Sequence, residues 1–137
     1  MVNLINKKII NIYDVYNALE DRFKNQINEK IYLIGLSDNV VRTFKNVSYN
    51  NTPESAYLNK NKLFDSLKSK KCNCFIISHN HPKYLSLPSK DDINLTKSLM
   101  KESRRYNYKL IEHLIYSDAL IWPIIKNNLH KEILWKN

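Results

Sequence analysis

Apolar positions near the start of the chain recur every three or four residues, and this spacing predicts a helix over residues 11–23. The face that this helix would bury carries Ile12, Val15, Tyr16, Leu19 and Phe23. Beyond a polar link, residues 30–36 form a largely apolar run of strand length. The turn formers Ser37-Asp38-Asn39 separate this run from residues 40–44, so we expect a β-hairpin.

The middle of the chain predicts a loop, a helix and a buried strand. Residues 46–61 are rich in asparagine and contain Pro53, which favours a loop with room for a short strand. Residues 60–68 predict a helix that buries Leu63, Phe64 and Leu67. The unbroken apolar run at 74–77 is typical of a central strand covered on both faces, and it leads directly into His79 and His81.

After a loop over 82–88, residues 89–106 predict a helix that turns Ile93, Thr96, Met100 and Ser103 inward. Residues 109–116 predict a further strand, and Trp122-Pro123 would interrupt the chain after it. The apolar residues of 124–136 fit neither the helical nor the strand period, so we leave that segment unassigned. The order of elements indicates a mixed α/β fold, and the length of 137 residues suits a single domain over 1–137.

Composition narrows the setting in which the chain works. No apolar run approaches the roughly 20 residues that cross a bilayer, and the first residues lack a secretory signal pattern, so we expect no membrane and a cytoplasmic location. Cys72 and Cys74 are too near in sequence to favour a disulfide and read as plain thiols, in keeping with a reducing compartment. Oligomeric state leaves no signal in the sequence.

The formal net charge of +9 would favour nucleic acid or another anionic partner. However, Asn, Lys, Ile and Tyr are abundant and glycine occurs once, which is also what A/T-rich codons supply. The cations Lys97, Lys101, Arg104 and Arg105 gather on the outward side of the helix predicted from Ser89, where a solvated face is the simpler interpretation.

One constellation carries chemistry: His79-x-His81, seven residues, and then Ser89-x-x-Asp92. In an extended chain, residues i and i+2 point to the same face, so both imidazoles can reach one metal ion while Asn80 points away. Asp92 would lie in the first turn of a helix, where the backbone amides favour a carboxylate. Two imidazoles and a carboxylate leave a fourth tetrahedral position for water, as in catalytic zinc sites, and this points to hydrolysis.

The motif resembles the JAMM motif. The sequence His-Asn-His-Pro followed by Pro-Ser-x-x-Asp is similar to the pattern of the RadC-like branch of the JAB (MPN) family. The likeness extends from about Ile12 to Asp118 and departs at Lys83-Tyr84, where Ser-Gly is usual. It implies a cytidine-deaminase-like fold with a curved mixed sheet flanked by helices. It also implies a Zn²⁺ ion and hydrolysis of peptide or isopeptide bonds in a peptide or protein substrate.

The same resemblance implies roles for two further residues. Glu29, just before the strand at 30–36, matches the glutamate that acts as general base and acid on the zinc-bound water. Ser89 matches the serine that hydrogen-bonds the oxyanion or orients the water.

Simpler interpretations stand beside these roles. Ser89-x-x-Asp92 is also a helix-start signature, Glu29 fits an ordinary strand entrance with Glu54 in reserve as base, and His113 fits a hydrogen-bonded core or second-shell position better than a fourth ligand. Nucleobase deamination is disfavoured because the Pro-Cys-x-x-Cys ligand pair is absent. The competing functions are a nucleic-acid-associated protein of DNA repair or mobile elements and a binding module with a vestigial metal site.

Overall fold

The computed structural model describes residues 2–82 and 87–129. Residues 83–86 of the predicted loop and residues 130–136 of the unassigned segment therefore lie outside the described residues. Within the described ranges, no helix combines the length and the apolar composition that crossing a membrane requires.

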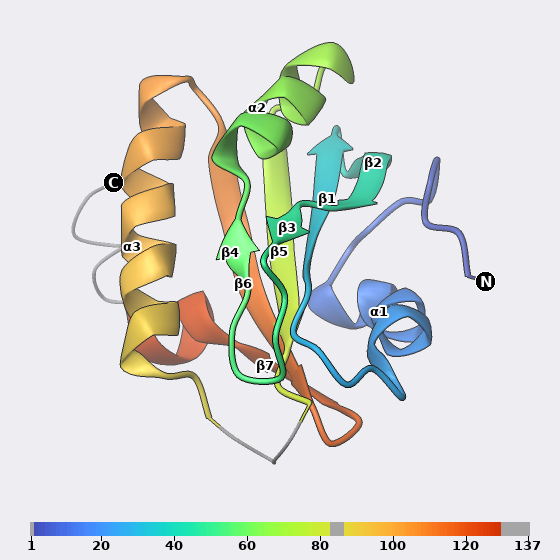
Figure 1. Ribbon diagram of the computed structural model, residues 1–137. Helices are drawn as coiled ribbons and strands as arrows, with labels where there is room; N and C mark the ends of the chain where they lie inside the picture. The colour runs from blue at the N-terminus through green and yellow to red at the C-terminus, as the bar shows by residue number, and fades with distance from the viewer. Residues whose placement is uncertain (1, 83–86, 130–137) are drawn as a thin grey trace.

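The central sheet has the strand order β2-β1-β5-β6-β7, so that β5 lies between the β1–β2 hairpin and the β6–β7 hairpin (Figure 1). β1 (Ile31–Ser37) pairs antiparallel with β2 (Val40–Asn46) and also with β5 (Cys74–Asn80). β5 pairs in parallel with β6 (Lys109–Ser117), which pairs antiparallel with β7 (Leu120–Pro123). The sheet is therefore mixed, and the first hairpin is the one that the turn residues predict.

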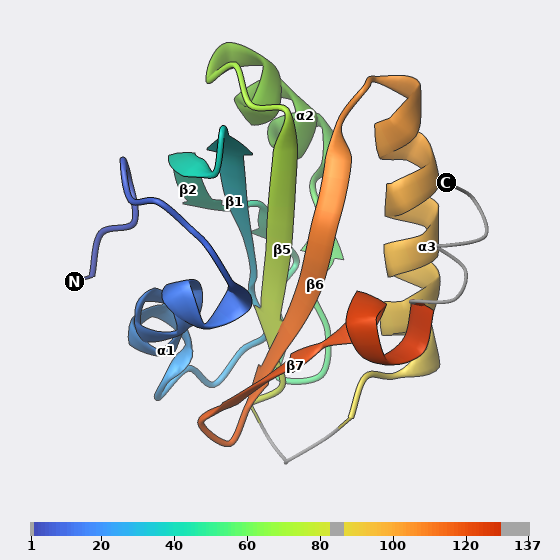
Figure 2. The same cartoon turned by 180° about the vertical axis from the view of Figure 1, so that it is seen from behind.

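Helices cover both faces of this sheet. The 3₁₀ helix η1 (Ile12–Val15) and α1 (Tyr16–Phe23) lie on one face, and α2 (Lys60–Ser69) and α3 (Lys90–Arg105) lie on the other. A short π-helix, η2 (Ile125–Leu129), packs on the same side as α3 (Figure 2). The chain thus has the α/β architecture of a mixed sheet between helices, as the sequence predicts.

The core is divided into two clusters by the sheet, because side chains alternate between its faces. Leu33, Phe75 and Ile77 pack with the cluster beneath α2 and α3, whereas Ile34 and Ile76 pack with the cluster beneath α1. All five of these side chains are buried. This two-sided cover explains why the strand sequences are almost continuously apolar and not alternating.

Some boundaries and one hairpin differ from the sequence prediction. The helix predicted over residues 11–23 begins as η1, capped by a reciprocal Asn11 and Asp14 box. The short strand expected before residue 61 is a pair, β3 (Ser48–Tyr49) and β4 (Tyr57–Leu58).

The sequence pattern does not predict β7 itself. Trp122 and Pro123, the residues predicted to interrupt the chain, are the last two residues of β7, so the break comes directly after Pro123. Proline is tolerated there because β7 lies at the edge of the described sheet, where a missing backbone N–H breaks no necessary ladder bond. The turn into β7 is made by Asp118 and Ala119, which have φ of 50° and 62°. This is the turn geometry that Asn-Gly ordinarily signals, and here the signal is absent.

Candidate metal centre

His79 lies near the end of β5, and His81 directly follows the last residue of that strand. His79 pairs with Ile31 of β1 on one side and with Ile115 of β6 on the other, so it lies in the middle of the sheet and is buried. The two imidazoles share a face, as the i and i+2 spacing predicts, and their Nε2 atoms lie 3.0 Å apart. His81 is half-buried and faces a pocket.

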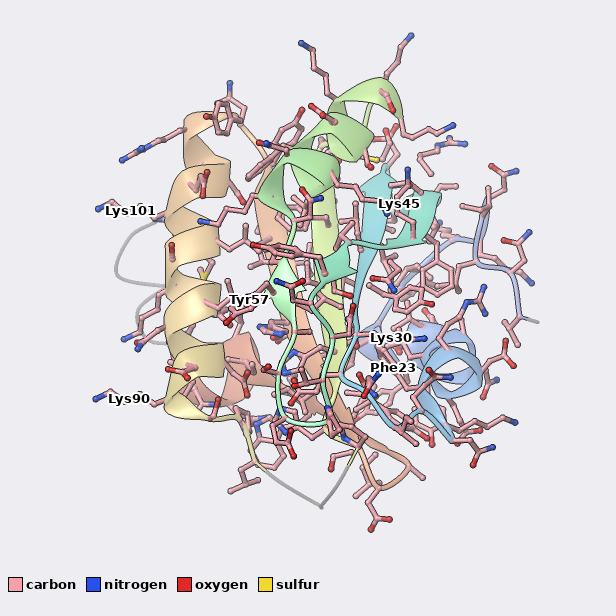
Figure 3. All side chains as sticks on the ribbon, viewed as in Figure 1. Phe23, Lys30, Lys45, Tyr57, Lys90 and Lys101 are labelled. Carbon is pink, nitrogen blue, oxygen red and sulfur yellow. The ribbon has the colours of Figure 1, made fainter. Side chains whose placement is uncertain are left out.

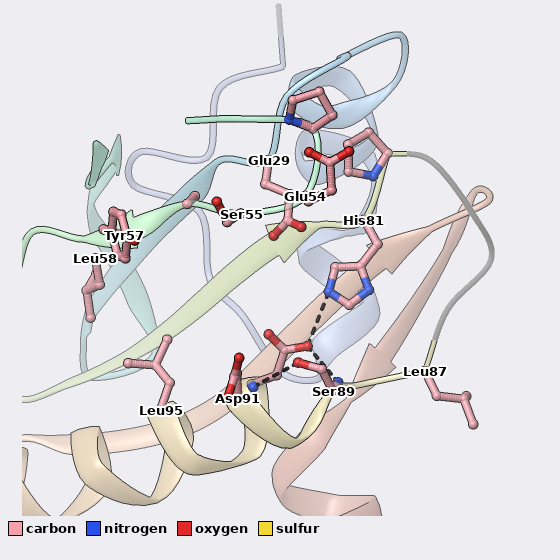
Figure 4. Close-up of a pocket in the computed structure, with 14 residues that line it drawn as sticks. Glu29, Glu54, Ser55, Tyr57, Leu58, His81, Leu87, Ser89, Asp91 and Leu95 are labelled. Atoms are coloured by element: carbon pink, nitrogen blue, oxygen red, sulfur yellow. Dashed lines mark hydrogen bonds and ion pairs between the residues drawn. The ribbon is translucent and has the colours of Figure 1, made fainter. Parts of the chain in front are cut away.

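Asp92 approaches the same two nitrogen atoms from the first turn of α3. Its Oδ1 lies 3.2 Å from His79 Nε2, and its Oδ2 lies 3.2 Å from His81 Nε2. Figure 4 shows the contact with His81 and the hydrogen bonds to Ser89 as dashed lines. A strand end and a helix start therefore bring two imidazoles and a carboxylate together.

Ser89 and Asp92 also form the helix cap that the sequence pattern allows. The Ser89 Oγ accepts a hydrogen bond of 3.1 Å from the Asp92 backbone N–H, and Asp92 Oδ2 accepts one of 2.8 Å from the Ser89 N–H. The structural and the functional interpretations of Ser89-x-x-Asp92 are thus compatible, because the cap itself aims the Asp92 carboxylate at the histidines. Ser89 remains exposed beside the pocket, and its hydroxyl hydrogen can still be donated.

The electrostatics favour a charged Asp92. Burial by itself would raise the pKa of this carboxyl, but the facing imidazoles of His79 and His81 and a hydrogen bond from the Ser89 backbone N–H outweigh burial and hold the pKa well below its usual range. Asp92 is therefore available as an anionic ligand.

Glu29 reaches the centre from the segment before β1. Ligand atoms of Glu29, His79 and His81 all lie within 4.8 Å of one another, so these residues could hold a metal ion. Burial raises the pKa of the Glu29 carboxyl, which makes it a better proton acceptor near neutral pH than an exposed glutamate. Glu54, the reserve candidate, is an exposed residue of the pocket wall.

Asn80 holds this segment in place, a role that sequence reasoning missed. Its side chain points away from the histidines, accepts a hydrogen bond of 2.7 Å from the Lys30 N–H and donates one of 3.1 Å to the Asn28 carbonyl. These two bonds flank Glu29 on both sides. The alternation of a strand shows that Asn80 points away, but only the tertiary structure shows what it meets.

The backbone of Glu29 itself is held by the Asn-rich loop. Its N–H donates to the Thr52 carbonyl at 2.8 Å, and its carbonyl accepts from Asn51 Nδ2 at 2.7 Å. Glu29 is thus positioned from β5 and from the loop at once.

His113 lies behind His79 and is not aimed at the pocket. Its Nε2 is 2.7 Å from His79 Nδ1, the nitrogen on the far side of the ring from Asp92, and its Nδ1 is 2.7 Å from Thr96 Oγ1. Burial holds the pKa of His113 well below its usual range.

A pocket of about 630 Å³ opens beside the centre. Four carboxylates line it, together with apolar side chains from β4, α3 and the segment before α3: Glu29, Glu54, Asp91 and Asp92, with Leu58, Leu87 and Leu95 (Figure 4). The pocket can accept a substrate with apolar groups, but its carboxylates oppose the entry of phosphate.

Comparison with known proteins places this arrangement in a family. A family model described as the RadC-like JAB domain matches residues 9–125, which include every residue of the centre. The chain belongs to the RadC-like JAB domain family. A UPF0758 protein of Aquifex aeolicus is 30% identical over 111 residues, covering 81% of this chain and 48% of that protein. A UPF0758 protein of Clostridium botulinum (strain Loch Maree / Type A3) is 29% identical over 81% of this chain and 49% of that protein.

A UPF0758 protein of Staphylococcus carnosus is 28% identical over 112 residues, and the alignment covers half of its length. The RadC-like JAB domain described here thus spans about half the length of the curated relatives that it matches.

Proposed function

We propose that this RadC-like JAB domain is a zinc-dependent hydrolase of amide bonds in peptides or proteins, with His79, His81 and Asp92 as the ligands of the ion. The observation that carries the proposal is the convergence of two Nε2 atoms and one carboxylate at separations of 3.0–3.2 Å. Ligand atoms about 2.0–2.1 Å from a tetrahedral zinc ion lie about 3.3–3.4 Å from one another, so the donor set fits the ion closely.

Asp92 is a better third ligand than Glu29. Each of its oxygen atoms already contacts one imidazole nitrogen at 3.2 Å, and its lowered pKa keeps it anionic. Glu29 lies within 4.8 Å of both histidines, and its raised pKa suits a group that exchanges protons. In this proposal, Asp92 is a ligand of the ion and Glu29 is the base.

The residues around the centre supply the remaining chemistry of amide hydrolysis. A zinc ion in this site would lower the pKa of a bound water toward neutrality. Glu29 would accept the proton of that water and return it to the leaving amine. Ser89, exposed at the pocket, would donate its hydroxyl hydrogen to the oxyanion that develops on the carbonyl.

Glu29→Gln is the variant that tests the division of roles. It removes the proton acceptor but not a proposed ligand, so turnover of a peptide library should fall by roughly 10²-fold or more while zinc stays bound. Asp92→Asn should instead lower the zinc content. Glu54→Gln is the matched control on the pocket wall and should leave turnover within about twofold. Unchanged turnover in Glu29→Gln, or its loss only in Glu54→Gln, would reject Glu29 as the base.

A further inference from the structure

His113 and Thr96 form a buried relay behind the candidate ligand His79. Both side chains are fully enclosed, with 0% exposure. His113 comes from β6, the strand beside β5, and Thr96 comes from α3, one helical turn beyond Asp92. Neither residue touches the pocket, so neither has a place in the chemistry proposed above.

The hydrogens in this relay can be assigned from the groups that it contains. The Thr96 hydroxyl donates to the Asp92 backbone carbonyl at 2.7 Å, because a carbonyl can only accept. A hydroxyl has a single hydrogen, so Thr96 Oγ1 must accept the bond of 2.7 Å from His113 Nδ1–H. An enclosed imidazole is neutral unless it is paired with a charge, so His113 Nε2 carries no hydrogen.

The last bond of the relay then determines which ring nitrogen of His79 carries the hydrogen. Because His113 Nε2 can only accept, His79 Nδ1 must donate the bond of 2.7 Å between them. In a neutral His79, Nε2 therefore carries no hydrogen and presents its lone pair to Asp92 Oδ1 at 3.2 Å and to His81 Nε2 at 3.0 Å. The lone pair of His79 Nε2 and those of Asp92 Oδ1 then repel each other unless a cation lies between the two atoms.

We propose that Thr96 and His113 are positioning residues that hold His79 in its metal-binding tautomer and thereby set the affinity of the centre for its ion. This inference rests on the proposed metal site. The relay also ties two of the proposed ligands together, because Asp92 supplies the carbonyl that orients Thr96 and the carboxylate that faces His79.

Thr96→Val tests the relay, because valine keeps the shape of threonine and removes its hydroxyl. Competition with a chromophoric chelator should show Zn²⁺ affinity weakened by roughly 10–100-fold, the range found when the partner of a ligating histidine is lost. Thr96→Ser keeps the hydroxyl and should restore affinity to within about threefold of the natural chain. Thr96→Val with unchanged Zn²⁺ affinity would overturn the proposal.

Ser103 offers a matched control on the same helix. Its buried hydroxyl makes the same kind of bond to the carbonyl four residues before it, Leu99, at 2.6 Å, but it lies away from the centre. Ser103→Ala should lower the melting temperature without changing Zn²⁺ affinity. An equal loss of affinity in Ser103→Ala and Thr96→Val would mean that the effect is general destabilisation of α3 and would also overturn the proposal.

The tautomer can be measured without any metal. In ¹⁵N spectra of the metal-free natural chain, the hydrogen should be on Nδ1 of His113 and on Nδ1 of His79. A hydrogen on His113 Nε2 would refute the relay even if every variant failed to fold. A chain with the expected spectrum that takes up no Zn²⁺ would refute the proposed hydrolase while leaving the hydrogen-bond assignment intact.

Discussion

Gly35, the one glycine of the chain, lies in β1 where no side chain fits. A Cβ added there would lie 2.6 Å from Thr43 Cγ2 and 2.8 Å from Cys72 Sγ. Thr43 and Cys72 are both buried, so neither can move aside freely.

Gly35→Ala should therefore destabilise the fold by about 1–3 kcal/mol through overpacking, as measured by urea denaturation. Cys72→Ala in the same chain removes one of the two clashing atoms and should recover part of the loss. If the losses of stability in Gly35→Ala and Cys72→Ala simply add in the double variant, the overlap with Cys72 is not the cause of the destabilisation.

The shortage of glycine leaves other residues in left-handed conformations. Lys71 has φ of 56° just after α2, where the Cys72 N–H bonds the Leu67 carbonyl and the Lys71 N–H bonds the Lys68 carbonyl. This is the Schellman arrangement, whose left-handed position glycine fills without strain.

Lys71→Gly should stabilise the protein by roughly 0.5–1 kcal/mol in the same denaturation experiment. Lys70→Gly is the control, since Lys70 has an ordinary φ of −95° and should only lose stability. If the two substitutions have the same effect, backbone strain at Lys71 is not a factor.

Among the elements, β5 both presents the histidines and fixes Glu29 through Asn80. Asn80→Ala removes the acceptor of the Lys30 N–H and the donor to the Asn28 carbonyl. The Lys30 amide should then exchange with deuterium faster, while the amides within β5 keep their protection. Unchanged exchange at Lys30 would mean that the Asn51 and Thr52 contacts alone hold the segment.

The π-helix η2 depends on a buried carboxylate from β6. Glu112 accepts hydrogen bonds from the backbone N–H groups of Ile125 at 2.7 Å and Lys126 at 3.1 Å, and from its neighbour His113 at 2.8 Å. Glu112→Ala should destabilise the fold by about 2–4 kcal/mol, because these amides lose their acceptor. Glu112→Gln retains one acceptor oxygen, so its free energy of unfolding should lie between those of the natural chain and of Glu112→Ala. An equal loss of stability in both variants would contradict the capping role.

The elements show where sequence reasoning succeeds and where it stops. The helical period of residues 89–106 predicts their helix because only one side of that helix is buried. The unbroken apolar run at 74–77 predicts its strand because both faces of that strand are covered. β7 escapes prediction because Asp118-Ala119 makes its turn without glycine or asparagine. The metal motif brings His79, His81 and Asp92 to attention, but the partners of Asn80 and the path from Thr96 to His79 depend on tertiary contacts that no local pattern encodes.

For the molecule as a whole, the charge is distributed unevenly. The chain carries +9 overall, yet the pocket at the centre is lined by four carboxylates. Lys97, Lys101, Arg104 and Arg105 are exposed on α3, whose outward side shows Lys90 and Lys101 projecting into solvent (Figure 3).

The nucleic-acid alternative would place phosphates on this outer surface and not in the pocket. It predicts DNA binding that weakens steeply with salt and a flatter salt slope when these four α3 cations become alanine. If no DNA binding is found at low salt, the nucleic-acid alternative is rejected and the hydrolase proposal is unaffected.

The metal content of the purified protein tests the central claim most directly. Elemental analysis should find about one zinc ion per chain, and the metal should be lost when His79, His81 and Asp92 are replaced together by Gln, Gln and Asn. A natural chain that neither carries nor takes up zinc, or a triple variant that keeps it, would contradict the account.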